Sequence, residues 1–440
     1  MVKRPKPTGM PQPRLAYITA GAAGMYCGSC MHDNTLARGL SRIGVDVQLI
    51  PTYTPIRTDE DNVSIDRVFY GGISVFLEQQ LGWYRYVAPL LSPIVDQPWL
   101  IRWATRSAGA TDPRMLGALT VSMLRGAGGR QKGEAAKLCR WLSDSVHPHL
   151  IQFSNILIGG CIPSVKADLR VPIVVTLQGD DVFLESLPDP FRGQAIAEIQ
   201  RLVKYVDGFL VHSRYYADFM SDYLQIPRNK IHQVPLGIDT TGFSAERAVA
   251  PPGRPPTIGY LARLAPEKGF HLLIDAFLEL RRHVPDVQLR AAGWIGAHLR
   301  TYVDAQFAKL RDAGCDQAFE YVGSVDREGK LAFLRGLDVL SVPTTYCEPK
   351  GIFVLEALAA GVPVVQPEHG AFPELVSKLG GGMLVPPDDP HALAEKLGEL
   401  LEHPALGEKL GEAGQRAVHQ HHSAEAIARE TWATLEQFLT

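Results

Sequence analysis

Two glutamates stand eight residues apart around a glycine, in the string Glu348-Pro-Lys-Gly-Ile-Phe-Val-Leu-Glu356. The apolar run after Gly351 predicts a loop that leads into a helix. At the start of a helix, unpaired N–H groups and the helix dipole attract an anion. Glu356, about one turn into the helix, can face the same pocket as Glu348. The pattern fits an anion-binding pocket with two carboxylates, although two solvated acids on an ordinary amphipathic helix would give the same spacing.

Two cations frame another loop, Arg263-Leu-Ala-Pro-Glu-Lys268-Gly269, which follows a predicted strand and opens a predicted helix. Open α/β sheets bind ligands beyond the carboxyl ends of their strands. Arginine and lysine at such a place can clamp a diphosphate. Taken alone, a pair of this kind is more often solvated surface.

Strands and helices alternate in both halves of the chain, which predicts two doubly wound α/β domains. The first half has predicted strands at 15–18, 45–49, 150–153, 173–177 and 208–212. The second half has them at 257–260, 287–291, 319–322, 339–342 and 362–365, and a helix opened by Asp389 and Pro390.

The expected domain organisation begins with a flexible basic arm at 1–14. An N-terminal domain at 15–245 contains a helical insertion at about 70–144. After a proline-rich linker comes a C-terminal domain at 246–422. A closing helix at 423–440 is expected to return to the N-terminal domain.

Read together, the two loops resemble the donor domain of the family 4 retaining glycosyltransferases. The strings that carry the resemblance are Gly259-Tyr-Leu-Ala-Arg263 with Lys268-Gly269, Glu348-x7-Glu356, Leu358-Ala-Ala-Gly-Val-Pro-Val-Val365, Val234-Pro-Leu-Gly-Ile-Asp239, Phe319-Glu-Tyr-Val-Gly323, Asp338-Val-Leu-Ser-Val-Pro343 and Gly370-Ala-Phe-Pro-Glu374. The resemblance implies the GT-B fold, in which two Rossmann-like domains face each other across a cleft, the N-terminal domain on the acceptor side and the C-terminal domain binding the donor. It also implies a hexosyltransferase-like enzyme that moves a sugar from a nucleotide-diphosphate donor to a hydroxyl acceptor, with retention.

The resemblance assigns roles to single residues. Arg263 and Lys268 would neutralise the donor diphosphate, since a leaving diphosphate needs positive charge where it develops. Glu348 would hold the transferred sugar and, with the two cations, form the catalytic set. Glu356 would bind the ribose hydroxyls. Further donor contacts are implied for Gly28, Val325, Gly351, Ile352 and Phe353.

The resemblance implies no metal and no cofactor, because the nucleotide sugar is a co-substrate. Lys350 departs from the family pattern, which has Phe at that position.

A CxxC motif, Cys27-Gly-Ser-Cys30, opens the first predicted helix. A thioredoxin-like dithiol is conceivable there, because the motif follows a strand and begins a helix. A zinc site would need further ligands, which the scattered remaining cysteines do not supply. The resemblance places Gly28 instead where such enzymes keep a glycine against the donor phosphate, with the cysteines as bystanders.

Acceptor contacts are predicted at the end of one N-terminal strand, in Gln178-Gly-Asp180-Asp181. The family often has a histidine where Gln178 stands, and helix capping would account for the two acids equally well. Trp83 and Trp99 lie in the most aromatic stretch of the insertion and suit stacking on a sugar or contact with a membrane interface. A subdomain core would explain the same rings.

Composition sets the remaining expectations. The chain has 440 residues with 44 Lys+Arg against 47 Asp+Glu, a balance that argues against a nucleic-acid partner. The expected partners are a nucleotide-sugar donor and a glycan, glycolipid or small-molecule acceptor. Six cysteines are too few for a disulfide scaffold, which favours a cytoplasmic location, with peripheral membrane contact as an option.

Three alternatives to transfer remain. They are a sugar-nucleotide epimerase or hydrolase on the same fold, a CxxC dithiol oxidoreductase, and a regulator that binds sugar nucleotides without turnover. Against the oxidoreductase on a Rossmann-like domain, neither half has G-x-G-x-x-G after a strand. His419, His421 and His422 are predicted to be solvated residues between two helices.

Overall fold

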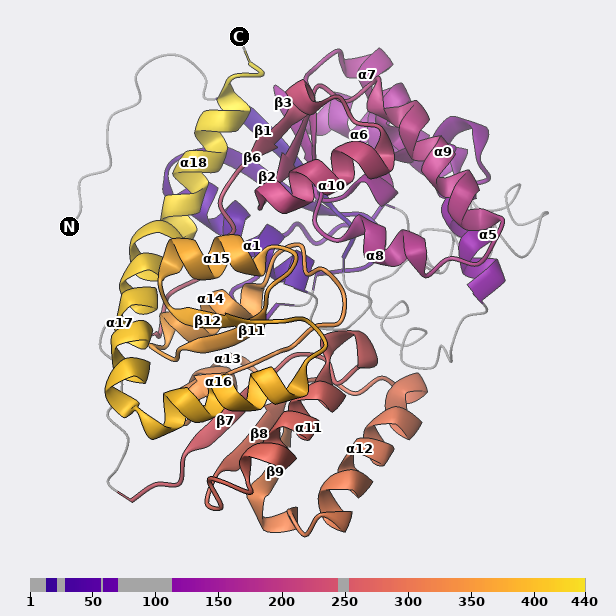
Figure 1. Cartoon of the computed structure of the whole chain (residues 1–440). Coiled ribbons are helices and arrows are strands. Elements are labelled where there is room, and N and C mark those ends of the chain that lie inside the picture. Colours follow the sequence, from indigo (N-terminus) through magenta and orange to yellow (C-terminus); the bar gives the residue numbers. More distant parts are fainter. Residues whose placement is uncertain (1–12, 22–27, 57, 70–112, 244–252, 440) are drawn as a thin grey trace. The chain divides into compact units, whose positions relative to one another are not determined.

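The computed structural model describes residues 13–21, 28–56, 58–69, 113–243 and 253–439. Its internal contacts divide the chain into two units. The first unit comprises Met1–Leu210, Met220–His232 and Ala428–Thr440, and the second comprises Val211–Phe219 and Gln233–Ile427. Each unit is built on one sheet covered by helices (Figure 1).

The sheet of the first unit has the order β2-β1-β3-β4-β5-β6. Its strands are β1 (Arg14–Thr19), β2 (Asp46–Pro51), β3 (Leu150–Phe153), β4 (Ile173–Thr176), β5 (Gly208–Val211) and β6 (Ile231–Gln233). Leu15 of β1 pairs in parallel with Val47 on one side and Leu150 on the other. The chain therefore reverses its direction of travel across the sheet between β1 and β3, which makes this a topological switch point.

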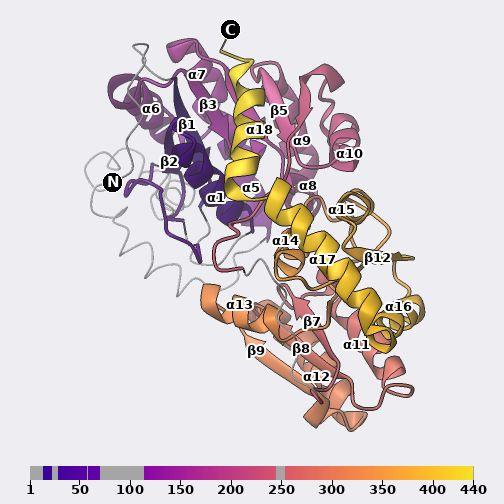
Figure 2. The same ribbon diagram turned by 90° about the vertical axis from the view of Figure 1, so that its left-hand side faces the viewer.

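Helices cover this sheet. They are α1 (Gly28–Arg42), α5 (Pro113–Leu124), α6 (Lys132–Trp141), α7 (Ile162–Leu169), α8 (Asp180–Glu185) and α9 (Phe191–Val203). Helices α6 and α7 lie side by side (Figure 2). Two further helices, α10 (Arg214–Leu224) and α18 (Ala424–Glu436), are each divided between the two units.

The sheet of the second unit has the order β12-β11-β10-β7-β8-β9, and its strand pairs are parallel. The strands are β7 (Thr257–Leu261), β8 (Gln288–Ala292), β9 (Phe319–Gly323), β10 (Val339–Leu340), β11 (Val364–Pro367) and β12 (Gly382–Val385). Counted from β9, this is the 3-2-1-4-5-6 order of dinucleotide-binding sheets, with the switch point between β7 and β10.

The helices of the second unit are α11 (Phe270–Leu280), α12 (Arg300–Asp312), α13 (Arg327–Arg335), α14 (Ile352–Ala359), α15 (Phe372–Leu379), α16 (Pro390–Glu402) and α17 (Pro404–His421). Helix α11 buries Phe270, Leu273, Ile274 and Phe277, spaced for one helical face, against the sheet. Each such side chain contributes about 1.5–3 kcal/mol by leaving water. Helices α11 and α16 lie side by side (Figure 1).

The predicted fold class, two Rossmann-like α/β domains, is confirmed. The prediction that a strand begins at Val362 was wrong by two residues, because the Val362 N–H still bonds to Ala357 O at the end of α14. Strands β6 and β12 and helix α17 were not predicted. The prediction for the three histidines was wrong in part. His419 and His421 belong to α17, and the buried His422 bonds through Nδ1 to Leu236 O at 2.6 Å.

Candidate functional site

The loops after β7 and β10 meet at the switch point of the second sheet. The first carries Arg263 and Lys268, and the second carries Glu348. A backbone bond from Thr345 N to Glu267 O, 3.1 Å long, joins them. Because these strands are neighbours in the sheet, both loops leave it at the same edge.

Two glycines let the surrounding loops approach closely. Gly269 has φ of +67°, and a Cβ there would lie 1.6 Å from the carbonyl oxygen of Pro343. Gly370, with φ of +59°, would place a Cβ 2.6 Å from Glu348 N. Any other residue would meet both the strained backbone and the neighbouring loop. The loops after β7, β10 and β11 are therefore held together at Glu348.

An ion pair with a third polar member lies at this junction. Lys268 Nζ is 2.7 Å from Glu348 Oε2, and both atoms are 2.5 Å from the hydroxyl of Tyr346. The Lys268 ammonium also lies 4.9 Å from the centre of the Tyr346 ring, within cation–π range. Glu348 is 5% exposed. The arrangement places one cation, one anion and one hydroxyl in contact.

This environment fixes the charge of Glu348. Burial alone would raise the pKa of its carboxyl. The charge and hydrogen bond of Lys268, the Tyr346 hydroxyl and the charge of Lys350 outweigh burial and lower the pKa to about 2. Burial and the nearby Glu348 charge raise the pKa of Tyr346 well above its usual value. At neutral pH the site therefore holds a carboxylate and a protonated phenol.

The N-terminus of α14 completes the junction. The other oxygen of Glu348, Oε1, accepts from the N–H groups of Lys350 and Gly351, each at 3.3 Å. Ile352 and Phe353 are the first two residues of α14, so their N–H groups lie where the helix dipole is positive. The Phe353 ring centre is 5.7 Å from Lys268 Nζ. An anion beside Lys268 would also lie near this helix end.

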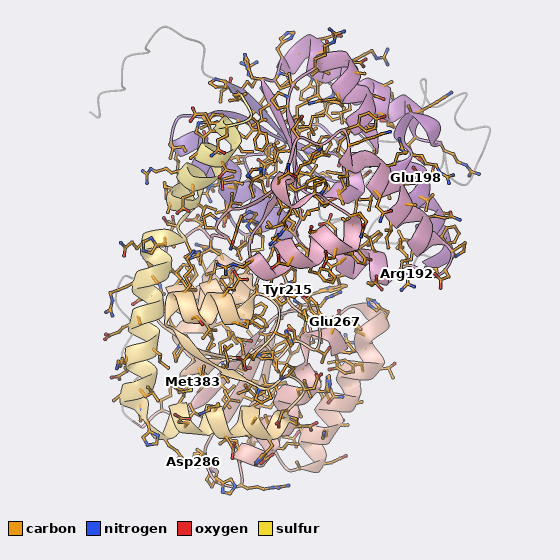
Figure 3. All side chains as sticks on the ribbon, turned by 45° about the horizontal axis from the view of Figure 1, so that its top comes forward. Arg192, Glu198, Tyr215, Glu267, Asp286 and Met383 are labelled. Atoms are coloured by element: carbon orange, nitrogen blue, oxygen red, sulfur yellow. The ribbon has the colours of Figure 1, made fainter. Side chains whose placement is uncertain are left out.

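Arg263 is the exposed member of the site. Its side chain is 42% exposed and pairs with Glu267 at 2.5 Å, as expected for residues four apart in a turn. Figure 3 labels Glu267 in the second unit. The hydroxyl of the buried Tyr260 donates to Arg263 O at 2.9 Å, which fixes the backbone of this loop on the core. The guanidinium is thus held at the edge of the sheet and open to a ligand.

Glu356 has a partner that the sequence analysis missed. Lys330 Nζ lies 2.6 Å from Glu356 Oε1, and the two side chains are 6% and 9% exposed. Lys330 is on α13, which Asp326 caps and which follows the part-buried Val325. The sequence did hold a sign that Lys330 is buried. Lys330 stands three and four residues before the buried Phe333 and Leu334, a spacing that places it on the buried face of α13. Glu356 is therefore tied to the segment after β9.

Lys350, the departure from the family pattern, is buried at 8% exposure. Its charge acts on Glu348 and also on His212. Burial and this charge lower the pKa of His212 to about 3, so its ring is neutral at pH 7.

The predicted acceptor residues of the first unit lie in a buried polar network. Gln178 Nε2 donates to Asp33 Oδ1 at 3.1 Å and to Ser154 O at 2.8 Å. Asp33 also accepts from the hydroxyls of Tyr17 and Thr19 at 2.8 and 2.6 Å. Asp33 was not predicted, since one acid in a helix gives no signal of its burial.

Asp180 serves the same network. Its carboxylate accepts from Ile156 N and Gln178 N, both at 2.9 Å. Burial raises its pKa to about 6, against the lowering effect of these two N–H groups. Asp180 and Asp181 form the first turn of α8, where acids favour the helix dipole. The N–H groups of Ile156 and Gln178 lie outside α8, so these two bonds are not contacts that cap that helix.

The described residues include the N-terminal loop only up to Gly21 and again from Gly28. Gly28 is the exposed first residue of α1, and Cys30 is 3% exposed inside that helix. Cys27, Trp83 and Trp99 lie outside the described residues.

Within the described ranges, no three His, Cys, Asp or Glu side chains converge in a way that could hold a metal ion. Among the helices of those same ranges, none has the length and apolarity needed to cross a bilayer.

Comparisons with protein families and with curated proteins show what this chain is similar to. The family model described as glycosyl transferases group 1 matches residues 244–417, and that described as glycosyltransferase family 4 matches 117–241. The phosphatidyl-myo-inositol mannosyltransferase of Mycobacterium tuberculosis is 35% identical over 196 residues, which are 43% of this chain and 50% of the relative. The glycogen synthase of the same species is 28% identical over 66% of this chain and 68% of the relative. The chain thus spans about half the length of the mannosyltransferases it matches.

Solved structures agree on the fold. Sucrose-phosphate synthase from Thermosynechococcus elongatus superposes with a TM-score of 0.70 at 17% identity, over 97% of this chain and 99% of that one. The Anabaena protein Alr3699/HepE in complex with UDP and glucose gives 0.67 at 17% identity, over 97% and 100%. With both family models matching in sequence and the switch-point site in place, the chain belongs to the family 4 glycosyltransferases and has the GT-B fold.

Proposed function

We propose that this glycosyltransferase moves a sugar from a nucleotide-diphosphate donor to a hydroxyl acceptor and retains the anomeric configuration. The observation that carries the proposal is the buried contact of Lys268 with Glu348 at the switch point, beside the N-terminus of α14. Open α/β sheets bind nucleotides at this place.

The donor diphosphate would lie against Lys268, Arg263 and the first N–H groups of α14. Lys268 would turn from Glu348 to the phosphate, and Tyr346 would keep its hydrogen bond to the carboxylate. Positive charge held ready where the leaving group becomes negative lowers the barrier to its departure. These groups supply that charge from the protein itself, which supports a metal-independent reaction.

Glu348 would face the sugar as a carboxylate. Before the donor binds, its pKa of about 2 keeps it ionised at neutral pH. It can accept a hydrogen bond from a sugar hydroxyl and stabilise the positive charge that develops on the ring. The acceptor would attack on the face that the diphosphate leaves, and the diphosphate would take the acceptor's proton.

Glu356 would bind the ribose hydroxyls, oriented by Lys330, and the base would lie toward Val325. Gly28, at the exposed start of α1, remains the proposed backbone contact from the first unit. The acceptor is proposed to be a glycan, a glycolipid or a small amphipathic molecule. Relatives named for phosphatidylinositol and for glycogen support a hydroxyl of this kind. Trp83, Trp99 and Asp181 stay the proposed acceptor contacts, with peripheral membrane contact if the acceptor is a lipid.

Thermal stabilisation by UDP-, GDP- and ADP-sugars tests the proposal, because a bound donor stabilises the fold by mass action. We expect at least one donor to raise the Tm, and Lys268→Ala to remove most of that rise. Lys309→Ala is the matched control, since Lys309 pairs with Asp275 between the outer helices α12 and α11. No rise with any donor, or an equal loss in both variants, would contradict the donor site.

The competing epimerase or hydrolase reaction uses the same donor and needs no alcohol acceptor. Product analysis separates the two. A transferred glycoside supports the proposal, whereas free sugar or an epimerised donor as the sole product contradicts it.

A further inference from the structure

Trp294 lies beyond the carboxyl end of β8, in a loop that is pinned on both sides. Its carbonyl accepts a hydrogen bond from Leu264 N at 3.1 Å, next to Arg263. The preceding residue, Gly293, donates to Gly323 O at the end of β9 at 2.9 Å, and its own carbonyl accepts from the Tyr321 hydroxyl at 2.7 Å. Trp294 is therefore held between the loop of Arg263 and the end of β9.

Despite this fixed backbone, the Trp294 side chain is 42% exposed. Within the described part of the chain, the other large apolar side chains with comparable exposure are all valines. The indole lies close over Gly296, where a Cβ would stand 3.1 Å from its Cη2 atom. An aromatic ring supported by backbone on one side and open to solvent is suited to stack on a flat ligand.

The order of strands relates Trp294 to the donor site. Glu348 follows β10, Lys268 follows β7, Trp294 follows β8 and Val325 follows β9, and these strands are successive neighbours in the sheet. With about 4.8 Å between neighbouring strands, the edge from β10 to β9 is roughly 14 Å long. A donor lying along this edge would have its sugar at Glu348, its diphosphate at Lys268, and its base at the β8 and β9 end.

We propose that Trp294 is the stacking surface for the nucleobase of the donor, with Val325 bounding the same subsite from the β9 side. The proposal rests on the proposed function, because it assumes a nucleotide donor at this edge. Stacking on a tryptophan face tolerates any base, so the subsite adds affinity to every nucleoside diphosphate.

Titration of the full chain with UDP, GDP, ADP and inorganic pyrophosphate tests the subsite. Trp294→Ala should weaken binding of the nucleoside diphosphate that the wild type prefers by roughly 5- to 150-fold, the effect of one lost base stack. Trp294→Phe should restore much of the affinity. Pyrophosphate, which has no base, should bind the wild type and Trp294→Ala equally. Val322→Ala is the matched control, because Val322 is an apolar side chain on β9 with 37% exposure.

Two outcomes overturn the subsite. If the wild type binds a nucleoside diphosphate and Trp294→Ala binds it equally well, the base lies elsewhere while the proposed function stands. If the wild type binds none of the three, the proposed function fails and the base subsite with it. A loss of pyrophosphate affinity equal to the loss of nucleotide affinity would also contradict stacking, because it would show a general disturbance of the edge.

Discussion

The hydroxyl of Tyr346 contacts both charges of the site. It accepts from Lys268 and donates to Glu348, each at 2.5 Å. In Tyr346→Phe, the Glu348 carboxylate loses the hydrogen bond from this hydroxyl, so the pKa of Glu348 should rise from about 2 toward the ordinary value. We expect the variant to lose donor affinity at a higher pH than the wild type as the solution is acidified.

The direction follows from the protonation of Glu348. A protonated Glu348 carboxyl accepts a hydrogen bond from the donor sugar less well than the carboxylate does, so donor binding should fall as pH drops through the pKa of Glu348. Donor titrations across acidic pH measure the midpoint. Tyr302→Phe is the control, because its hydroxyl bonds to His271 in the same unit and does not contact Glu348. Identical pH profiles for the wild type, Tyr346→Phe and Tyr302→Phe would contradict the role given to Tyr346.

The buried pair of Lys330 and Glu356 makes a different prediction at the same scale. Removing one partner of a buried ion pair costs about 3–5 kcal/mol, because the other charge is left without compensation. Lys330→Met should therefore lower the free energy of unfolding far more than Lys396→Met, whose pair with Glu399 is exposed and contributes about 0–1 kcal/mol. Urea unfolding of both variants measures the difference. The double variant Lys330→Met with Glu356→Leu should recover much of the loss, and a further loss would show that the pair is not the cause.

At the scale of elements, the loop after β7 depends on Gly269. Gly269→Ala should destabilise the protein by more than the roughly 1–2 kcal/mol of a left-handed residue, since its Cβ would also collide with Pro343. Gly314 offers a matched control, because it has φ of +68° and a Cβ added there would meet nothing within 4 Å. We expect Gly314→Ala to show the conformational cost alone in chemical unfolding. Equal costs at the two glycines would mean that the β7 and β10 loops can separate freely.

Elements with strong local signals could be predicted from sequence. The apolar face of α11 and the cap of α16, where Asp389 accepts from Ala392 N at 2.9 Å, followed from side-chain spacing and helix-start rules. Strands β6 and β12 are three and four residues long, most of their residues are part-exposed, and each is defined by pairing with β5 or β11 across an intervening helix. Local pattern does not reveal such pairing.

The site residues likewise fall into those that the sequence could predict and those that it could not. Lys268 and Glu348 could be placed near each other, because both follow strands and the switch point brings them together. Tyr346 and Lys330 were missed, since their importance comes from contacts with Lys268 and Glu356, which lie 78 and 26 residues away in the sequence. A single sequence records which side chains exist and does not record which distant ones they meet.

At the scale of the whole molecule, the two switch points differ in their contents. In the first unit, the hydroxyls of Tyr17 and Thr19 and the amide of Gln178 all donate to Asp33, so its carboxylate is already engaged within the unit. In the second unit, Lys268 and Glu348 neutralise each other, and Arg263 stands exposed beside them. An ion pair of this kind can exchange partners with an anionic ligand. This difference favours the second unit as the place where the donor is held.

Hydrogen exchange can test that assignment over the whole chain. A donor at 100 times its Kd stabilises the unit that binds it by about 2.7 kcal/mol, so amides exposed only by unfolding of that unit should exchange roughly 100-fold more slowly. We expect this slowing in β7, β10 and α14, and little change in β1 and β4, because each unit has its own sheet and core. Lys268→Ala should abolish the slowing. Slowing confined to β1 and β4 would move the donor to the first unit, and equal slowing in both would show that the two units unfold together.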